Sequence, residues 1–163
     1  MKQIDNSLLD SLTRKARESP RKRAHHNLHP DLADPVQRLC VAIEPGTYIR
    51  PHRHISPDTF EVFLLLRGSA VFLMFDDSGK VTERLVLKAG GPVMAVEIPA
   101  KTWHALASLE SGTIFFETKQ GPYAQPTEHH VASWAPAEGE PGAPQFEAWY
   151  KAARVGDVSP TSA

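Results

Sequence analysis

The chain has 163 residues and a mass of 18.0 kDa, with 41% hydrophobic and 23% charged residues, which suits one globular domain and excludes two full ones. Its 18 Lys and Arg residues nearly balance its 19 Asp and Glu residues, which argues against binding nucleic acid through bulk charge. The sequence shows no stretch of the ~20 apolar residues that cross a bilayer, no signal-peptide pattern, and a single cysteine that excludes an internal disulfide. We therefore expect a cytoplasmic protein that binds neither nucleic acid nor a membrane.

The first predicted element is a helix over residues 5–19. Apolar residues recur there near a 3.6-residue period after a group of capping residues, and Pro20 ends the pattern. The polar stretch 21–30 that follows favours neither helix nor strand, and we interpret it as an ordered loop or edge segment. Three histidines of this stretch are interpreted as solvated rather than as a cover over a binding site: His25, His26 and His29.

Between residues 36 and 118, short apolar runs alternate with turn residues, which is typical of an all-β sandwich or barrel. The runs predict eight strands, over residues 36–43, 48–54, 59–66, 70–75, 82–87, 93–98, 103–109 and 113–118. The chain is thereby divided into an N-terminal helix with a His-rich loop, a β-barrel, and an extended tail rich in Pro and Gly. The predicted boundaries are 1–30, 31–123 and 124–163.

The tail contains aromatic residues that need burial, and a short helix is predicted within it over residues 145–153. Such a tail wraps either its own barrel or a partner subunit. Together with the apolar face of the N-terminal helix, these aromatic residues lead us to expect a homodimer. The aromatic residues are Trp134, Phe146, Trp149 and Tyr150.

Four titratable residues fall at positions of the predicted barrel where packing alone would favour apolar side chains. His52 and His54 are two apart on a predicted strand, so both imidazoles face the same side. Glu61 shares a face with apolar neighbours on the next strand, where an unpaired carboxylate is strongly unfavourable. His104 can add a third imidazole. Such a set suits one divalent transition metal per chain, Fe, Mn, Ni, Cu or Zn, with open coordination positions.

The spacing of these residues resembles the first motif of the cupin superfamily. Gly46 is followed by five residues, His52, one residue and His54, and Glu61 is followed by six residues and Gly68. The stretch that ends at His104 resembles the second cupin motif. The resemblance implies a cupin-type double-stranded β-helix, or jelly-roll barrel, with these three histidines and Glu61 as metal ligands.

The chain departs from the cupin pattern at three places. Ser108 stands where Asn is common, and the other two departures concern a spacing and a turn. Six residues rather than three or four separate His54 from Glu61, which implies a wider loop and leaves Asp58 as a rival carboxylate. Lys101 stands in place of a glycine of the second motif, and this predicts a different turn. Neither of these two departures removes a ligand.

At closer range the chain resembles the WbuC family of cupin-fold metalloproteins, which is associated with O-antigen gene clusters. Residues 34–38, 44–54 and 116–123 carry this resemblance, which extends over residues 4–138. It implies the fold and the metal, but it does not supply a reaction.

Five further residues are candidates to line a polar pocket around the metal: Tyr48, Arg50, Glu117, Lys119 and Tyr123. Arg50 lies two residues before His52 on the predicted strand, so a guanidinium is expected beside the metal, where it can hold a carboxylate or phosphate. The alternative is a structural ion pair between Arg50 and Glu117 or Glu44. The expected ligand is a small polar or anionic molecule, such as a sugar or sugar nucleotide.

Three functions are compatible with these residues, and the sequence assigns no catalytic residue. The first is a metal-dependent enzyme that acts on such a small molecule, with a link to O-antigen or polysaccharide biosynthesis. The second is a non-catalytic module that uses the metal to bind or regulate. The third is a metal-free sugar-nucleotide epimerase, which would use a histidine and an acid in place of a ligand cluster.

Overall fold

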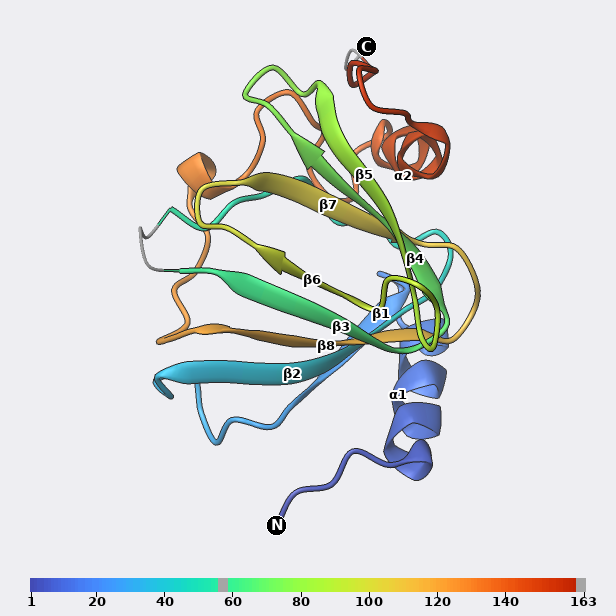
Figure 1. The fold of residues 1–163 in the computed structure, drawn as a ribbon, viewed down its shortest axis with the longest axis vertical. Helices are drawn as coiled ribbons and strands as arrows, with labels where there is room; N and C mark the ends of the chain where they lie inside the picture. Colours follow the sequence, from blue (N-terminus) through green and yellow to red (C-terminus); the bar gives the residue numbers. More distant parts are fainter. Residues whose placement is uncertain (56–58, 161–163) are drawn as a thin grey trace.

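The structure is a computed structural model that describes residues 1–55 and 59–160. Among these residues, the strands form two antiparallel sheets that enclose an apolar interior (Figure 1). The five-stranded sheet has the order β1-β2-β8-β3-β6, and the three-stranded sheet has the order β5-β4-β7. The first sheet contains β1 (Arg23–Asn27), β2 (Val36–Ile43), β8 (Thr113–Gln120), β3 (Glu61–Arg67) and β6 (Ala95–Ile98). The second contains β5 (Val81–Lys88), β4 (Ser69–Phe75) and β7 (Trp103–Ser108).

The N-terminal helix α1 (Asn6–Glu18) confirms the predicted helix. The Asp5 carboxylate caps it by accepting a hydrogen bond from the Leu8 amide at 2.9 Å. The buried side of α1 packs on the outer face of the five-stranded sheet, where Leu12 lies against the apolar cluster of β2 and β8. The polar segment after α1 contributes the edge strand β1, in agreement with the expected edge segment.

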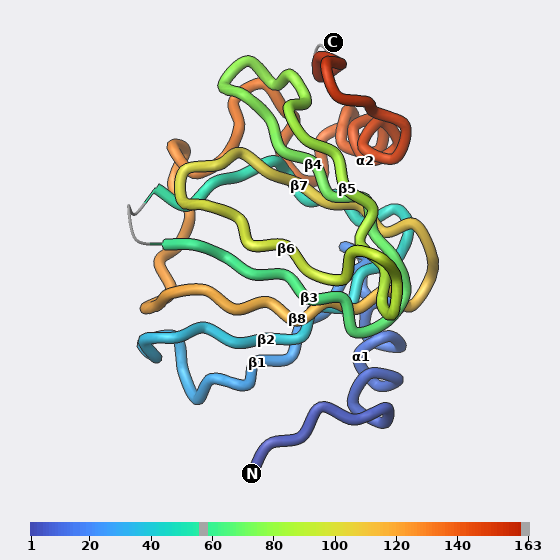
Figure 2. Tube along the Cα trace, viewed as in Figure 1, coloured from blue at the N-terminus to red at the C-terminus, as the bar shows by residue number. Residues whose placement is uncertain are grey.

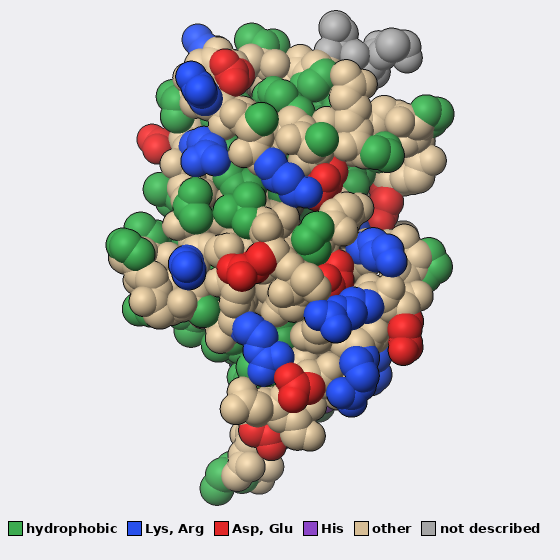
Figure 3. Space-filling view, turned by 90° about the vertical axis from the view of Figure 1, so that its right-hand side faces the viewer, with side chains coloured by type: hydrophobic (Ala, Val, Ile, Leu, Met, Phe, Trp, Pro, Cys, Tyr) green, Lys and Arg blue, Asp and Glu red, His purple; other side chains and the backbone are tan. Residues whose placement is uncertain are grey.

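Basic and acidic side chains are mixed on the side of the molecule shown in Figure 3. Two ion pairs connect α1 to the barrel: Arg67 Nη1 lies 2.7 Å from Asp10 Oδ1, and Arg17 Nε lies 3.3 Å from Glu44 Oε1. Ion pairs in which one side chain is this exposed contribute about 0–1 kcal/mol each to the stability of the fold. The apolar contacts of α1 therefore hold it in place.

The tail packs on the outer face of the three-stranded sheet of its own chain. It contains a 3-10 helix, η1 (Glu128–His130), and α2 (Ala143–Ala152), which lies in the place of the predicted short helix. Phe146 and Tyr150 are fully buried against Tyr48 and Phe75. These contacts remove the main reason for expecting a homodimer, which stays a prediction. None of the helices in the described residues is both long and apolar enough to span a bilayer.

The predicted strand over residues 48–54 is wrong. This segment is extended, but it makes strand-like pairing only around His52. Pro51 has no backbone N–H, so a continuous ladder cannot form through it. Instead, residues 51–53 lie between the start of β7 and residues 130–132 of the tail (Figure 2). The segment therefore obtains its conformation from two parts of the chain that are distant in sequence.

The packing of the tail predicts a specific alkaline response. The Tyr48 hydroxyl donates to the Pro136 carbonyl at 2.9 Å, and burial raises the pKa of Tyr48 from 10 to about 12. Because the fold favours the neutral phenol, this contribution to stability is complete below pH 10 and is lost as the pH rises through 12. In Tyr48→Phe, the deficit in unfolding free energy relative to wild type should shrink between pH 10 and 12. Denaturant titrations followed by Trp fluorescence measure this difference in unfolding free energy. A difference that stays constant from pH 10 to 12 contradicts the prediction.

Candidate metal centre and mouth pocket

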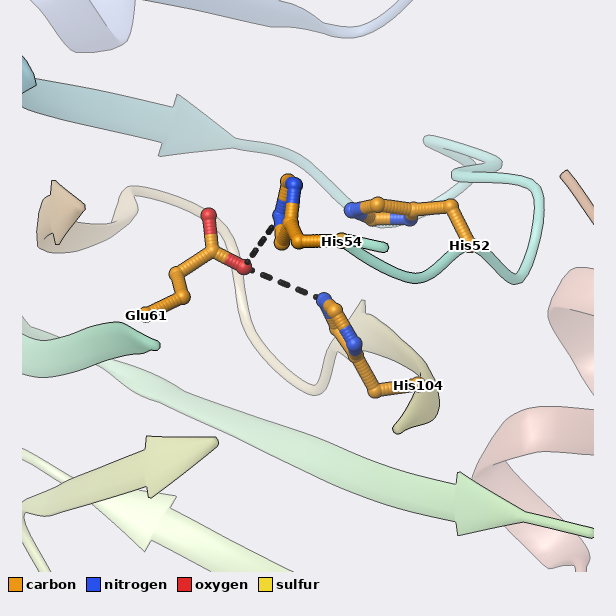
Figure 4. Close-up of side chains that lie close together, drawn as sticks. All are labelled: His52, His54, Glu61 and His104. Carbon is orange, nitrogen blue, oxygen red and sulfur yellow. Dashed lines mark hydrogen bonds and ion pairs between the residues drawn. The ribbon is translucent and has the colours of Figure 1, made fainter. Parts of the chain in front are cut away.

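Four side chains converge inside one end of the barrel, with ligand atoms that all lie within 4.8 Å of one another: His52, His54, Glu61 and His104 (Figure 4). Glu61 is the first residue of β3 and shares its inward face with Phe63. His104 is the second residue of β7 and shares its inward face with Leu106. The two other histidines come from the extended segment that follows β2.

Backbone hydrogen bonds on both sides fix the segment that carries His52. On one side, the amides of His52 and His104 each donate to the carbonyl of the other at 3.0 Å. On the other side, the Arg53 amide donates to the His130 carbonyl and the Ala132 amide donates to the Pro51 carbonyl, both at 2.9 Å. The tail is therefore part of the support of the site.

Carbonyl contacts determine which nitrogen is free on two of the histidines. Nδ1 of His52 lies 3.1 Å from the Arg50 carbonyl oxygen, and Nδ1 of His104 lies 2.9 Å from the Thr102 carbonyl oxygen. A carbonyl accepts only from an N–H, so in the neutral rings Nδ1 carries the proton and Nε2 has a lone pair. Such contacts orient histidines that bind a metal through the other nitrogen.

The Glu61 carboxylate, which is 1% exposed, lies against the Nε2 atoms of His54 and His104. Its Oε2 is 3.2 Å from His54 Nε2 and 3.1 Å from His104 Nε2, yet His104 Nε2 is buried and has no hydrogen-bond partner among the described residues. Two electron-rich atoms at this separation need a proton or a cation between them. The donor set, three imidazole nitrogens and a carboxylate, fits a divalent transition metal.

A chain of charges continues from Glu61 along β8. Lys119 is paired with Glu61 in the sheet register, and its Nζ lies 3.1 Å from Glu61 Oε1 and 2.6 Å from Glu117 Oε1. One ammonium thus lies between two buried carboxylates. Burial, reinforced by the negative charge of Glu61, raises the pKa of Glu117 to about 8.

The protonation states of the cluster suit a metal. Burial, together with the neighbouring His104 imidazole, lowers the pKa of His52 to about 3, so His52 is neutral at pH 7. Burial opposes ionisation of Glu61, but the imidazoles of His104 and His54 and the Lys119 ammonium hold its pKa well below the usual 4.5. A neutral imidazole and an ionised carboxylate are the forms that bind metals.

Two of the four ligand candidates, His52 and His54, line a pocket of about 490 Å³ at this end of the barrel, which we call the mouth pocket. Its lining residues come from the segment before β3, from the end of β8 and the residues after it, and from η1. It is lined by His52, Arg53, His54, Ile55, Thr59, Lys119, Gln120, Gly121, Pro122, Tyr123, Ala124, Pro126 and His130. Of the five predicted pocket residues, Lys119 and Tyr123 line it, and Glu117 contacts Lys119 directly.

The structure places Tyr48 and Arg50 away from the mouth pocket, in contrast to the prediction. Tyr48 is buried against the tail, and Arg50 Nε donates to the Ala132 carbonyl at 3.0 Å. The physical reason is that this segment is not a regular pleated strand, so the alternation of faces does not extend from His52 back to Arg50, which contacts the tail instead. The alternative ion pair is not formed either, because Glu44 contacts Arg17 and Glu117 contacts Lys119.

Three other predictions near the site have different outcomes. Lys101 has φ of 66°, the left-handed conformation that glycine adopts readily, so the turn is not of a different kind. His25 and His26 are exposed as expected, but His29 is buried and its Nδ1 lies 3.0 Å from the Arg38 amide. The rival ligand Asp58 lies outside the described residues.

Two side chains of the mouth pocket that can carry charge, Arg53 and His130, were missed by the sequence analysis. Arg53 lies between two predicted ligands, so strict alternation placed it on the opposite face. Its guanidinium carbon is 4.2 Å from the centre of the Trp103 ring, and its Nη1 is 3.3 Å from Asp77 Oδ1. His130 stands in a Pro-rich tail without a motif, and no local signal identifies it.

Comparisons with known proteins support the fold. Residues 4–87 match the family model described as "Domain of unknown function (DUF6016)". The TT1209 structure from Thermus thermophilus is 22% identical, with a TM-score of 0.51 over 74% of this chain and 97% of that chain. KdgF from Halomonas sp. is 18% identical, with a TM-score of 0.49 over 65% and 84% of the two chains. A cupin superfamily protein from Desulfitobacterium hafniense is 17% identical, with a TM-score of 0.47 over 60% and 76%.

No curated protein matches the sequence. At the identities found among solved structures, the likeness concerns the fold alone. The two antiparallel sheets with an N-terminal helix confirm the predicted all-β, jelly-roll barrel.

Proposed function

This chain belongs to the family described as "Domain of unknown function (DUF6016)", and we propose that it is a metal-dependent enzyme that acts on a small anionic molecule in the mouth pocket. The observation that carries the proposal is the buried Nε2 of His104, which lies 3.1 Å from an ionised carboxylate without a hydrogen-bond partner in the described part of the chain. His52, His54, Glu61 and His104 would hold the metal. When bound, it would act as a Lewis acid on an oxygen atom of the ligand.

Residues of this chain prepare the site for that role. The Arg50 and Thr102 carbonyls hold two imidazoles with Nε2 toward the cluster. Lys119 binds Oε1 of Glu61 and thereby leaves Oε2 directed at the histidines. Since Lys119 also lines the pocket, it adds a positive charge beside the ligand. An anionic ligand is therefore favoured over a cationic one.

Finer features of the proposal rest on the sequence. The resemblance to the WbuC family supports a sugar or sugar nucleotide as ligand and a role in O-antigen or polysaccharide biosynthesis. We also propose that the protein is a cytoplasmic homodimer. The expected ligand makes sugars and sugar nucleotides the first compounds to test.

The test begins with the untagged full chain, purified without chelator and subjected to elemental analysis. We expect about one Fe, Mn, Ni, Cu or Zn ion per chain, and turnover of a small anionic compound in a panel that includes sugar nucleotides, because the cluster leaves coordination positions open. His25→Ala is the matched control, since His25 is an exposed histidine of β1.

Each negative result has a defined meaning. If the chain contains no metal and none of the five ions binds, the proposed metal site is wrong, and a metal-free activity such as epimerisation takes its place. If the metal binds but no compound in the panel is turned over, the result favours a non-catalytic binding module.

A further inference from the structure

His130 differs from the predicted metal ligands in the nitrogen that carries its proton. Its Nδ1 lies 3.1 Å from the backbone amide of Thr127 and 2.9 Å from the Thr127 hydroxyl. An amide N–H can only donate, so Nδ1 of His130 accepts and the proton of the neutral ring is on Nε2. His52 and His104 have the opposite arrangement, because their Nδ1 atoms lie against carbonyls. His130 therefore offers a hydrogen-bond donor where the other two offer lone pairs.

The residue that carries this donor lines the mouth pocket. His130 lines the pocket together with Lys119 and Arg53. Lys119 has three N–H bonds, of which its contacts with Glu61 and Glu117 take two, so one is left for a ligand. The Arg53 guanidinium is held in place over the Trp103 ring. The pocket thus combines a fixed neutral donor with two cationic side chains.

The backbone fixes His130 beside the candidate metal centre. The His130 carbonyl accepts from the Arg53 amide at 2.9 Å, next to the position where Val131 pairs with His52. The backbone of His130 is consequently held by the same short ladder that positions His52, and its ring is held by Thr127. His52 and His54 line the same mouth pocket as His130.

We infer that His130 binds an oxyanion of the ligand, a carboxylate or a phosphate, through its Nε2–H, with Lys119 as the charged partner. This inference rests on the proposed function in one respect, since it assumes that another oxygen of the same ligand lies at the metal. The arrangement makes His130 a specificity-determining residue: it selects molecules that carry an anionic group at a distance from the oxygen that faces the histidine cluster. A neutral sugar without such a group lacks this interaction.

The experiment uses the full chain as purified, with its metal content measured, and two probes, inorganic phosphate and succinate. Long-range ¹H–¹⁵N spectra of the histidine side chains, recorded on zinc-loaded and on metal-free protein, should show the Nε2–H form for His130. Affinities are measured by amide shift changes for wild type and for three variants: His130→Ala, His130→Gln and His129→Ala. His129 is the matched control, since it is the exposed neighbour in η1.

We expect at least one probe to bind about tenfold more weakly to His130→Ala, the loss of one charge-assisted hydrogen bond, at unchanged metal content. His130→Gln keeps an N–H donor of similar reach and should recover part of the affinity, whereas His129→Ala should match wild type. The probe that depends on His130 distinguishes phosphate from carboxylate. The same pattern in a chain without metal supports the inference even though the proposed metal site fails.

Three results overturn the inference. The first is the Nδ1–H form of His130 in the spectra. The second is equal affinity of wild type and His130→Ala for both probes, which means that any bound oxyanion lies elsewhere. The third is that neither probe binds to wild-type protein in either metal state.

Discussion

Replacing His104 by alanine is expected to lower the affinity of the chain for its divalent metal by more than about 100-fold, since loss of mere supporting contacts around a metal already costs about 10- to 100-fold. His104 is fully buried, and its Nε2 is the ligand atom without a hydrogen-bond partner in the described residues. Its removal takes one of four donors from the cluster and leaves Glu61 with a cavity on one side. Glu61→Gln, which removes the charge at nearly constant volume, is expected to act in the same direction.

The measurement is a competition titration with a chromophoric chelator, combined with thermal unfolding in the presence and absence of the metal. A metal that binds the folded chain raises the melting temperature of wild type, and this increase should vanish in His104→Ala. Arg50→Gln serves as a matched control, because Arg50 contacts the Ala132 carbonyl and not the cluster. Equal loss of metal in Arg50→Gln and His104→Ala would point to general loosening of the segment and not to ligation.

Local patterns were sufficient to predict most strands and the candidate ligands. The strand Val36–Ile43 has the predicted bounds, because its apolar run is flanked by turn residues and nothing distant alters it. Glu61 was identified by an equally local observation, a carboxylate on the apolar face of a strand. Such a residue needs a partner in any barrel, and the structure provides one in the Lys119 ammonium, while the other carboxylate oxygen faces His54 and His104.

The errors concern features that depend on distant segments. Arg50 was expected in the pocket because residues 48–54 were interpreted as a pleated strand, whereas the segment pairs at His52 with β7 and with the tail. Neither partner is visible in the local sequence. His130 was missed for the same reason: its position depends on the path of the tail back across the barrel, and its tautomer depends on a contact with Thr127.

The tail is also where the largest change in stability is expected. Phe146 is 1% exposed and packs between Tyr48 and Trp149, with ring centres 6.4 and 5.9 Å away. Phe146→Ala removes the aromatic ring from this cluster and leaves a cavity, because the rings around it are attached to the barrel as well as to α2. We expect the free energy of unfolding to fall by about 3–5 kcal/mol.

Denaturant titrations of Phe146→Ala and of Gln145→Ala, an exposed position of the same helix, separate loss of packing from changes in helix propensity. The control should stay within about 0.5 kcal/mol of wild type. A loss below about 1 kcal/mol in Phe146→Ala would be too small for a buried ring and would mean that the tail does not pack on its own barrel. Since the same tail pairs with His52, a large loss would also imply that the tail and the metal centre unfold together.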